Sequence, residues 1–286
     1  MITSPVETTA EAVESHYDSL HRFYRDTWGV HLHHGLWERR GESAGEAVLN
    51  LSSAVSELAE IRSGDAVCDI GCGYGGAAIR LAETRQARVT GITLSQKQCN
   101  EAGKLAKELP PEVPLPGFVC GDWLENSFED ASFDAAISIE CLSHIADKAA
   151  FFREAGRVLK PGGNLGMAVW LDSENAGTLA IRHLLEPMCC EGRLAGLVTT
   201  SELKAFAESE GFSVEEIREV GRQVKRTWLV ISYRLACKVV TRKEYRRFLR
   251  ENLRSDRIFA LTVLRVIIAY EVGALEYGLV KLTRRI

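Results

Sequence analysis

The residues best suited to chemistry begin with a glycine-rich turn, "CDIGCGYGG", at residues 68–76. Gly71, Gly73 and Gly76 fit the nucleotide-binding pattern GxGxxG directly after a short apolar segment. Several cofactors use such a turn, so the glycines alone do not identify one. Asp69 stands two residues before the first glycine, where its carboxylate would repel the pyrophosphate of a nicotinamide or flavin dinucleotide. The turn therefore predicts a nucleotide-like cofactor without a phosphate at this point.

The ends of the next two apolar segments distinguish among such cofactors. Dinucleotide folds place a ribose-binding acid about 20 residues after the turn, but this segment ends in "GITLS", with Thr93 in that place. The following segment ends in "CGDW", where Asp122 could accept a hydrogen bond from an adenine amino group and Trp123 offers a stacking face. S-Adenosylmethionine has no phosphate, and its ammonium group needs acceptors such as Asp69. These residues predict S-adenosylmethionine as the cofactor.

Four segments, "DIGCGYGG", "GDW", "FDAAISIECLSHI" and "VLKPGG", resemble the class I S-adenosylmethionine-dependent methyltransferases in order and spacing. The resemblance covers nearly the whole chain. Within that class, "GITLSQKQ" is similar to the branch of tocopherol methyltransferases, plant alkaloid N-methyltransferases and cyclopropane fatty acid synthases, which often has Thr-Leu-Ser instead of the acid. The alternative is a nucleotide-binding sheet without catalysis. The predicted cofactor-binding residues are Tyr17, Trp28, Asp69, Gly71, Gly73, Thr93, Leu94, Gln98, Asp122 and Trp123.

Methyl transfer is an in-line displacement that holds the acceptor about 3 Å from the methyl carbon and needs a base where the acceptor bears a proton. Glu140 and His144 follow the fourth predicted strand in "SIECLSHIADK", at the sheet edge where such folds bind ligands. The related alkaloid N-methyltransferases have Glu-x-x-Glu-His here, credited with substrate positioning and proton removal. This chain has Ser143 in place of the second Glu. We predict Glu140 and His144 as catalytic, with His144 the better base, although a structural histidine bonded to backbone has the same sequence.

Three histidines, His31, His33 and His34, lie between two tryptophans in "WGVHLHHGLW". Adjacent side chains point apart in an extended segment, which disfavours a shared metal ion. The related branch has H-x-H-x-G sequences here that cover the substrate. We therefore predict a pocket wall and no metal site, with His34 catalytic and His33 and Trp37 in contact with the substrate; a solvated or structural histidine cluster is the alternative.

The chain as a whole predicts an α/β fold with a doubly wound, mostly parallel sheet. Residues up to about Ile61 have helical periodicity, whereas from Asp65 short apolar strands alternate with amphipathic helices. The resemblance implies a Rossmann-like methyltransferase sheet of seven strands. We expect an N-terminal helical cap at 1–61 and a methyltransferase core at 62–286.

The last strand of such a sheet is antiparallel, and its best candidate, "GLVKLTRRI", begins only at Gly278. Roughly fifty residues precede it where a hairpin would suffice, and long connections in compact domains are usually functional. They include "RTWLVISYRLACKVV", the basic helix "RKEYRRFLRENLRSDR" and an apolar run. We predict a helical substrate lid at about 221–277, with Trp228, Tyr233 and Tyr270 in contact with the substrate; a homodimer interface is the alternative.

Composition sets further bounds on the function. The net charge of −4 argues against a nucleic-acid partner. Most of the eight cysteines lie in apolar runs and read as reduced core residues of a cytoplasmic protein, and the polar N-terminus does not look like a signal peptide. The apolar run at 258–280 contains Arg265, Glu271 and Glu276, too many charges for stable membrane insertion.

Together these features predict a methyltransferase that acts on an apolar small molecule of specialised metabolism. The substrate is expected to be aromatic (an indole, phenol or amine) or prenylated, and to be methylated at nitrogen or carbon. Methylation of a prenyl or alkene carbon, or lipid chemistry of the cyclopropane type, is the alternative within the class. A non-catalytic cofactor-binding subunit is the alternative outside it.

Overall fold

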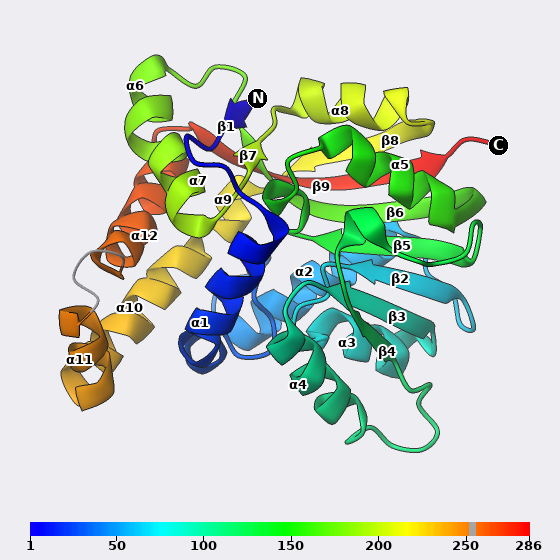
Figure 1. Ribbon diagram of the computed structural model, residues 1–286, viewed down its shortest axis with the longest axis horizontal. Helices are drawn as coiled ribbons and strands as arrows, with labels where there is room; N and C mark the ends of the chain where they lie inside the picture. The colour runs from blue at the N-terminus through cyan, green and yellow to red at the C-terminus, as the bar shows by residue number, and fades with distance from the viewer. Residues whose placement is uncertain (252–255) are drawn as a thin grey trace.

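The computed structural model describes residues 1–251 and 256–286, with side chains described outside 248–260. Its main feature is a seven-stranded sheet of order β4-β3-β2-β5-β6-β9-β8 (Figure 1). Among the described strands of this sheet, β9 alone runs antiparallel to its neighbours. The predicted mostly parallel, doubly wound sheet is therefore confirmed. The strands are β2 (Ala66–Ile70), β3 (Arg88–Thr93), β4 (Gly117–Cys120), β5 (Phe133–Ile139), β6 (Leu159–Asp172), β8 (Phe212–Glu219) and β9 (Leu275–Arg284), and a small separate sheet pairs β1 (Ile2–Thr3) with β7 (Gly196–Leu197).

Helices cover both faces of the sheet and one of its ends (Figure 1). α2 and α3 pack on one face, and α5 and α8 pack on the other. α1, α7, α10 and α12 gather where the carboxyl ends of the central strands lie. The first eight helices are α1 (Ala10–Trp28), α2 (Ala44–Leu58), α3 (Gly76–Arg85), α4 (Gln96–Ala106), α5 (Lys148–Val158), α6 (Thr178–Ala180), α7 (Glu186–Gly192) and α8 (Thr200–Ser209). Short non-α turns are η1 (Trp123–Glu125), η2 (Leu142–His144) and η3 (Ile181–Leu185).

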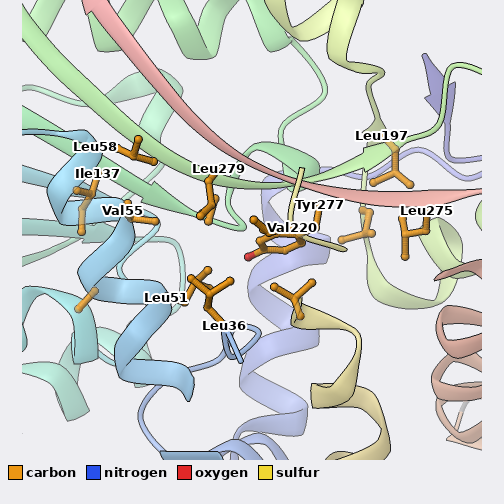
Figure 2. Close-up of a cluster of buried hydrophobic side chains, with 14 of the residues drawn as sticks. Leu36, Leu51, Val55, Leu58, Ile137, Leu197, Val220, Leu275, Tyr277 and Leu279 are labelled. Carbon is orange, nitrogen blue, oxygen red and sulfur yellow. The ribbon is translucent and has the colours of Figure 1, made fainter. Parts of the chain in front are cut away.

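The hydrophobic core has two layers because successive strand residues point to opposite faces of the sheet. Leu279 of β9 packs in one cluster with Leu51 and Val55 of α2 (Figure 2). The next residue, Val280, belongs to the other cluster with Phe152 of α5. Burying each such side chain contributes about 1.5–3 kcal/mol. This two-sided core fixes the sheet whose edge carries the site.

Helix α2 lies directly against β6. A Cβ atom at Gly166 would lie 2.3 Å from the carbonyl oxygen of Val55, so this close approach requires glycine. The helix begins at a capping box in which Ser43 and Glu46 exchange hydrogen bonds between side chain and backbone. Of the two helices in the predicted N-terminal segment 1–61, α2 therefore covers the sheet and α1 covers its edge.

The late insertion is helical, with α9 (Gly221–Val224), α10 (Arg226–Thr241), α11 (Lys243–Glu251) and α12 (Asp256–Glu271). The final strand begins at Leu275, three residues before the predicted Gly278, because Leu275–Tyr277 continue the pairing with the long strand β6. Residues 252–255 of the predicted basic helix lie outside the described residues. Within the described part of the chain, no helix combines the length and apolar character needed to cross a membrane.

Candidate functional site

A cavity of about 390 Å³ lies at the carboxyl ends of β2 to β5. This is the edge at which open α/β sheets bind their ligands. The glycine turn and the ends of β3 and β4 line one part of it, and residues of α1, α7, α10 and α12 line much of the rest. Among the predicted site residues, those that line it are Tyr17, Trp28, His33, His34, Gly71, Gly73, Thr93, Leu94, Gln98, Asp122, Trp123, Glu140, His144 and Trp228.

The glycine turn approaches the cavity closely. Gly71 and Gly73 have φ angles of 79° and 55°, a region that glycine enters without steric cost. A Cβ atom at Gly71 would lie 2.6 Å from the Cys141 side chain, whereas one at Gly73 would have no neighbour within 4 Å. A side chain at Gly73 would therefore occupy open space in the cavity, which makes this turn a cradle for a ligand.

Asp69 lies at the end of β2, next to this turn, and is 2% exposed. Among the described residues, its Oδ2 atom has no hydrogen-bond partner. Burial raises the pKa of Asp69 to about 7, although the backbone N–H of Ala78 opposes the shift. A buried carboxylate oxygen without a partner is costly unless a ligand completes it. Asp69 is not among the residues that line the cavity, but Gly71 and Gly73 of the adjoining turn are. The ammonium group of S-adenosylmethionine is a donor of the kind that this oxygen lacks.

The other predicted cofactor residues present polar groups with defined partners. Thr93 donates to the side-chain oxygen of Gln98 at 3.0 Å, so its hydroxyl hydrogen is not free for a ribose. Asp122 caps η1 through one carboxylate oxygen, which accepts from the Leu124 N–H at 2.8 Å. Trp123 is 4% exposed and donates to the carbonyl of Phe151, so its ring is held in the core at the cavity floor. The second carboxylate oxygen of Asp122 is the one that the prediction assigns to an adenine amino group, and no structural observation tests that contact.

Glu140 is the centre of a hydrogen-bond network between distant segments. Its Oε1 atom accepts from the backbone N–H and the Nδ1 atom of His34, both at 2.8 Å, and from the Tyr277 hydroxyl at 2.7 Å. Its Oε2 atom accepts from the Trp170 indole at 2.8 Å. Burial alone would raise the pKa of Glu140, but the interaction with His34 outweighs it and lowers the pKa to about 2. The residue also has a φ of 60°, a strained backbone conformation that the surrounding contacts must hold.

His34 extends this network to the lid. Its Nε2 atom lies 2.6 Å from the indole nitrogen of Trp228, which can only donate. Nε2 must therefore be an acceptor, and the ring proton is on Nδ1, facing Glu140. The Tyr270 hydroxyl lies 3.3 Å from the same Nε2 atom. Both nitrogens of His34 are thus engaged, so Glu140 and His34 join the N-terminal segment to β6, β9, α10 and α12.

His144 is held differently. Its Nδ1 atom lies 2.9 Å from the Arg193 carbonyl oxygen, which can only accept, so the ring proton is on Nδ1. Its Nε2 atom lies 3.0 Å from the Tyr17 hydroxyl and accepts from it. Burial lowers the pKa of His144 despite the Arg193 carbonyl, so the ring is neutral at neutral pH. Of the three residues predicted as catalytic, Glu140 is held by four protein donors and the Nε2 atom of His34 accepts from the Trp228 indole. Among the described residues, the Nε2 atom of His144 meets only the Tyr17 hydroxyl.

Three tryptophans from different elements form an aromatic wall in the cavity. Trp28 of α1 and Trp228 of α10 meet edge to face at 6.2 Å between ring centroids, and Trp170 of β6 meets Trp228 at 5.8 Å. Trp170 was not predicted as a site residue, although its place near the end of a predicted strand was a usable signal. Other lining residues that sequence reasoning missed are Met188, Glu191, Leu194, Thr227, Thr262 and Val266.

Three predicted substrate contacts do not line the cavity. Tyr233 is 72% exposed on the outer side of α10. Its predicted contact with the substrate is therefore wrong. Tyr270 is buried behind His34. Trp37 packs under the guanidinium of Arg226, 4.2 Å from its ring centroid. None of these three side chains is among the residues that line the cavity.

The other two histidines of the segment 31–34 are also at least partly buried, and the Nδ1 atom of His31 has no hydrogen-bond partner among the described residues. His33 is buried, with Nδ1 2.7 Å from the carbonyl of His34 and Nε2 3.4 Å from the Ser52 hydroxyl. His31 packs against Gly76 at the start of α3, and burial lowers its pKa to about 3. In the described part of the chain, no cluster of three or more His, Cys, Asp or Glu residues is arranged to hold a metal ion.

Comparisons with known proteins agree with this geometry. A family described as "Methyltransferase domain" matches residues 68–167. The chain is 30% identical to the 27-O-demethylrifamycin SV methyltransferase of Amycolatopsis mediterranei, over 77% of this chain and 80% of that protein. It is 27% identical to the chloroplastic tocopherol O-methyltransferase of Arabidopsis thaliana, over 96% of this chain and 82% of that protein. The fold matches the cyclopropane synthase MmaA2 of Mycobacterium tuberculosis with a TM-score of 0.84 at 19% identity, over 98% and 100% of the two chains.

The sequence match to a methyltransferase at this identity and coverage shows the family, and the glycine turn with Asp69 fits the family's cofactor. The resemblance found in the sequence is thereby confirmed. The chain belongs to the S-adenosylmethionine-dependent methyltransferases.

Proposed function

We propose that this enzyme methylates an aromatic small molecule with a largely apolar skeleton at a ring hydroxyl, and that His144 receives the hydroxyl proton. The observation that carries the proposal is the neutral imidazole of His144, whose Nε2 atom accepts from a phenol, that of Tyr17, at 3.0 Å. The Nδ1 hydrogen bond to Arg193 holds this tautomer. A substrate phenol that replaces the Tyr17 hydroxyl would find the same acceptor in the same place.

The cofactor would lie along the glycine turn. Asp69 would accept a hydrogen bond from the ammonium group of the cofactor, and Asp122 would accept one from its adenine amino group. Gly73 has no side chain, so the cofactor could lie directly against its backbone. Bound S-adenosylmethionine supplies a methyl group on a positively charged sulfur. The protein orients the acceptor toward that methyl group and keeps water out, which contributes more to the rate than any single proton transfer.

The aromatic wall supports an apolar ring as the acceptor. Trp28, Trp170 and Trp228 line the cavity in mutual ring contact and offer it large apolar faces. Two relatives are named for O-methylation, of 27-O-demethylrifamycin SV and of tocopherol, and they support oxygen as the acceptor. Other relatives are named for C-methylation of sterols, so the choice of oxygen over carbon depends on His144. A prenylated ring also suits such a wall.

Methylation of an alkene carbon is a second candidate, favoured by one observation. The ionised Glu140 lies behind Trp170 and next to the aromatic wall, so positive charge that develops on a substrate near this wall would be stabilised by ring faces and by the carboxylate. In that case no substrate hydroxyl would be needed, and His144 would not receive a phenolic proton.

The experiment is a methyl-transfer assay with labelled S-adenosylmethionine and a matched panel of acceptors. The panel pairs each phenol with its methyl ether, and adds an indole, an amine and a prenyl alkene of similar size. Label transfer to the phenols but not to their ethers supports the proposal. Label on the alkene, or on the ring carbon of the ethers, contradicts it in favour of carbon methylation.

A further inference from the structure

Lys148 is a charged residue that is almost completely buried, with 2% of its surface exposed at the start of α5. Its ammonium group donates to three backbone carbonyl oxygens, those of Leu142 at 2.8 Å, Ile145 at 2.7 Å and Gly196 at 3.1 Å. An ammonium group has three hydrogens, so every donor is used. Among the described residues, no carboxylate forms an ion pair with it. Burial lowers the pKa of Lys148 to about 8, so the fold holds this charge at a cost.

The three carbonyls belong to the two segments that hold His144. Leu142 and Ile145 flank the turn on which His144 lies, and Gly196 follows shortly after Arg193, whose carbonyl accepts from the His144 ring. A backbone hydrogen bond of 2.8 Å, from Ala195 to Ser143, joins the same segments. Lys148 therefore cross-links the turn that carries the imidazole to the segment that orients it.

The charge of Lys148 also acts on His144. Burial is the largest cause that lowers the pKa of His144, the Arg193 carbonyl raises it, and Lys148 lowers it further. The other titratable or charged groups around the ring are Tyr17 and His16 on α1, Glu140 at the end of β5, and Arg193 after α7. Of these groups, Glu140 raises the pKa of His144. Lys148 thus offsets the buried carboxylate and disfavours the imidazolium form.

We propose that Lys148 is a positioning residue of the reaction: its ammonium group clamps the two segments that orient His144 and so holds that imidazole with its Nδ1 atom on the Arg193 carbonyl. The inference rests on the proposed role of His144 as the base. It assigns Lys148 no contact with substrate or cofactor.

The test compares Lys148→Gln, which keeps hydrogen-bond donors without the charge, and Lys148→Met, which keeps neither. Lys104→Met is the matched control, because the Lys104 side chain is 70% exposed and lies on α4. Turnover is measured from pH 5 to pH 9, together with the affinity for S-adenosylhomocysteine.

Removing the positive charge raises the pKa of His144, so the acidic limb of the kcat profile should move to higher pH in both Lys148 variants. We expect kcat at pH 7 to fall about tenfold or more in Lys148→Met, to fall less in Lys148→Gln, and cofactor affinity to change less than twofold.

A folded Lys148→Met enzyme with the kcat and the acidic limb of the wild type would overturn the proposal. A second measurement needs no variant: nitrogen NMR of histidine-labelled wild-type protein at pH 7 should show His144 neutral and protonated on Nδ1. A spectrum with His144 charged, or protonated on Nε2, would contradict the clamp even if both variants fail to fold.

Failure of the proposed function would look different. If His144→Ala retains wild-type turnover, His144 is not the base and the proposed function is wrong in that respect. The NMR titration of His144 in wild type and Lys148→Gln then still decides whether Lys148 orients the ring and lowers its pKa.

Discussion

At the scale of single residues, the two buried carboxylates Glu140 and Asp69 differ in their hydrogen-bond donors and in the direction of their pKa shifts. Glu140 has four protein donors and an acidic pKa, whereas Asp69 has an oxygen without a partner among the described residues and a raised pKa. The difference indicates different roles. The fold supplies the hydrogen-bond donors of Glu140, whereas the role proposed for Asp69 is to accept from the ammonium group of the cofactor.

We predict that the affinity for S-adenosylhomocysteine depends on pH through Asp69. Burial raises the pKa of Asp69 to about 7, and the ligand's ammonium group prefers the ionised form, so affinity should rise by up to about tenfold between pH 6 and pH 8. Calorimetry at three pH values measures it. Asp69→Asn should bind more weakly and lose this slope, while Asp122→Asn should bind more weakly and keep it. An unchanged slope in Asp69→Asn would show that the carboxylate does not meet the ammonium group.

For Glu140 we predict a loss of stability that depends on pH. Folding lowers the pKa of Glu140 from 4.5 to about 2, so the carboxylate stabilises the folded state fully above pH 4.5 and ceases to do so as the pH falls toward 2. Glu140→Gln should therefore cost about 3 kcal/mol at pH 7, and this cost should shrink below about pH 4. Urea unfolding of both proteins at pH 7 and pH 3.5 tests this. A cost that is the same at both pH values would mean that the charge of Glu140 contributes nothing.

At the scale of elements, the lid helix α10 presents one face to the cavity and another to the solvent. Trp228 is 9% exposed and lines the cavity, whereas Tyr233 is 72% exposed. Five positions along a helix correspond to a rotation of about 140°, so the two side chains could not both have faced one cavity. The spacing of the two residues along a helix therefore already excluded the prediction that both side chains contact the substrate.

We predict that Trp228→Ala raises KM and that Tyr233→Ala does not. Loss of the Trp228 indole removes on the order of 2 kcal/mol of apolar contact, which is roughly a thirtyfold rise in KM if ground and transition states lose it equally. Affinity for the cofactor should not change in either variant. Sedimentation of both variants is the control for the homodimer alternative, because Tyr233 lies on the outer surface. A change in sedimentation by Tyr233→Ala, with unaltered KM in Trp228→Ala, would assign this helix to an interface.

Other elements show where sequence patterns are sufficient and where they are not. The glycine turn and the alternation of strands and helices follow from local spacing, and the structure contains both as predicted. Trp170 and Tyr277 meet at Glu140 because β9 pairs with β6 from Leu275 onward, a long-range pairing that no local pattern encodes. For the same reason the partners of His34 and Lys148 were not predicted, since each bond spans separate elements.

At the scale of the whole molecule, the cavity joins α1, the sheet edge and the lid, so ligand binding should stabilise the entire fold. We predict that S-adenosylhomocysteine at about one hundred times its dissociation constant raises the free energy of unfolding by about 2.7 kcal/mol. Denaturant unfolding with and without the ligand measures the change. Gly73→Val should lose this response, because its side chain would fill the cradle and because valine is strained at the φ of 55°. Equal stabilisation of Gly73→Val would place the cofactor elsewhere.

The most direct test of the central claim, that His144 receives the acceptor's proton, is the turnover of His144→Ala with the phenol that the panel identifies. The imidazole has its proton on Nδ1 and its basic nitrogen beside a hydroxyl. Loss of a base that acts in the transition state should lower kcat by about 10²-fold or more, while the affinity for S-adenosylhomocysteine stays within twofold of the wild type. A folded His144→Ala enzyme with turnover near that of the wild type would contradict the claim and leave orientation of the acceptor as the main contribution of this site.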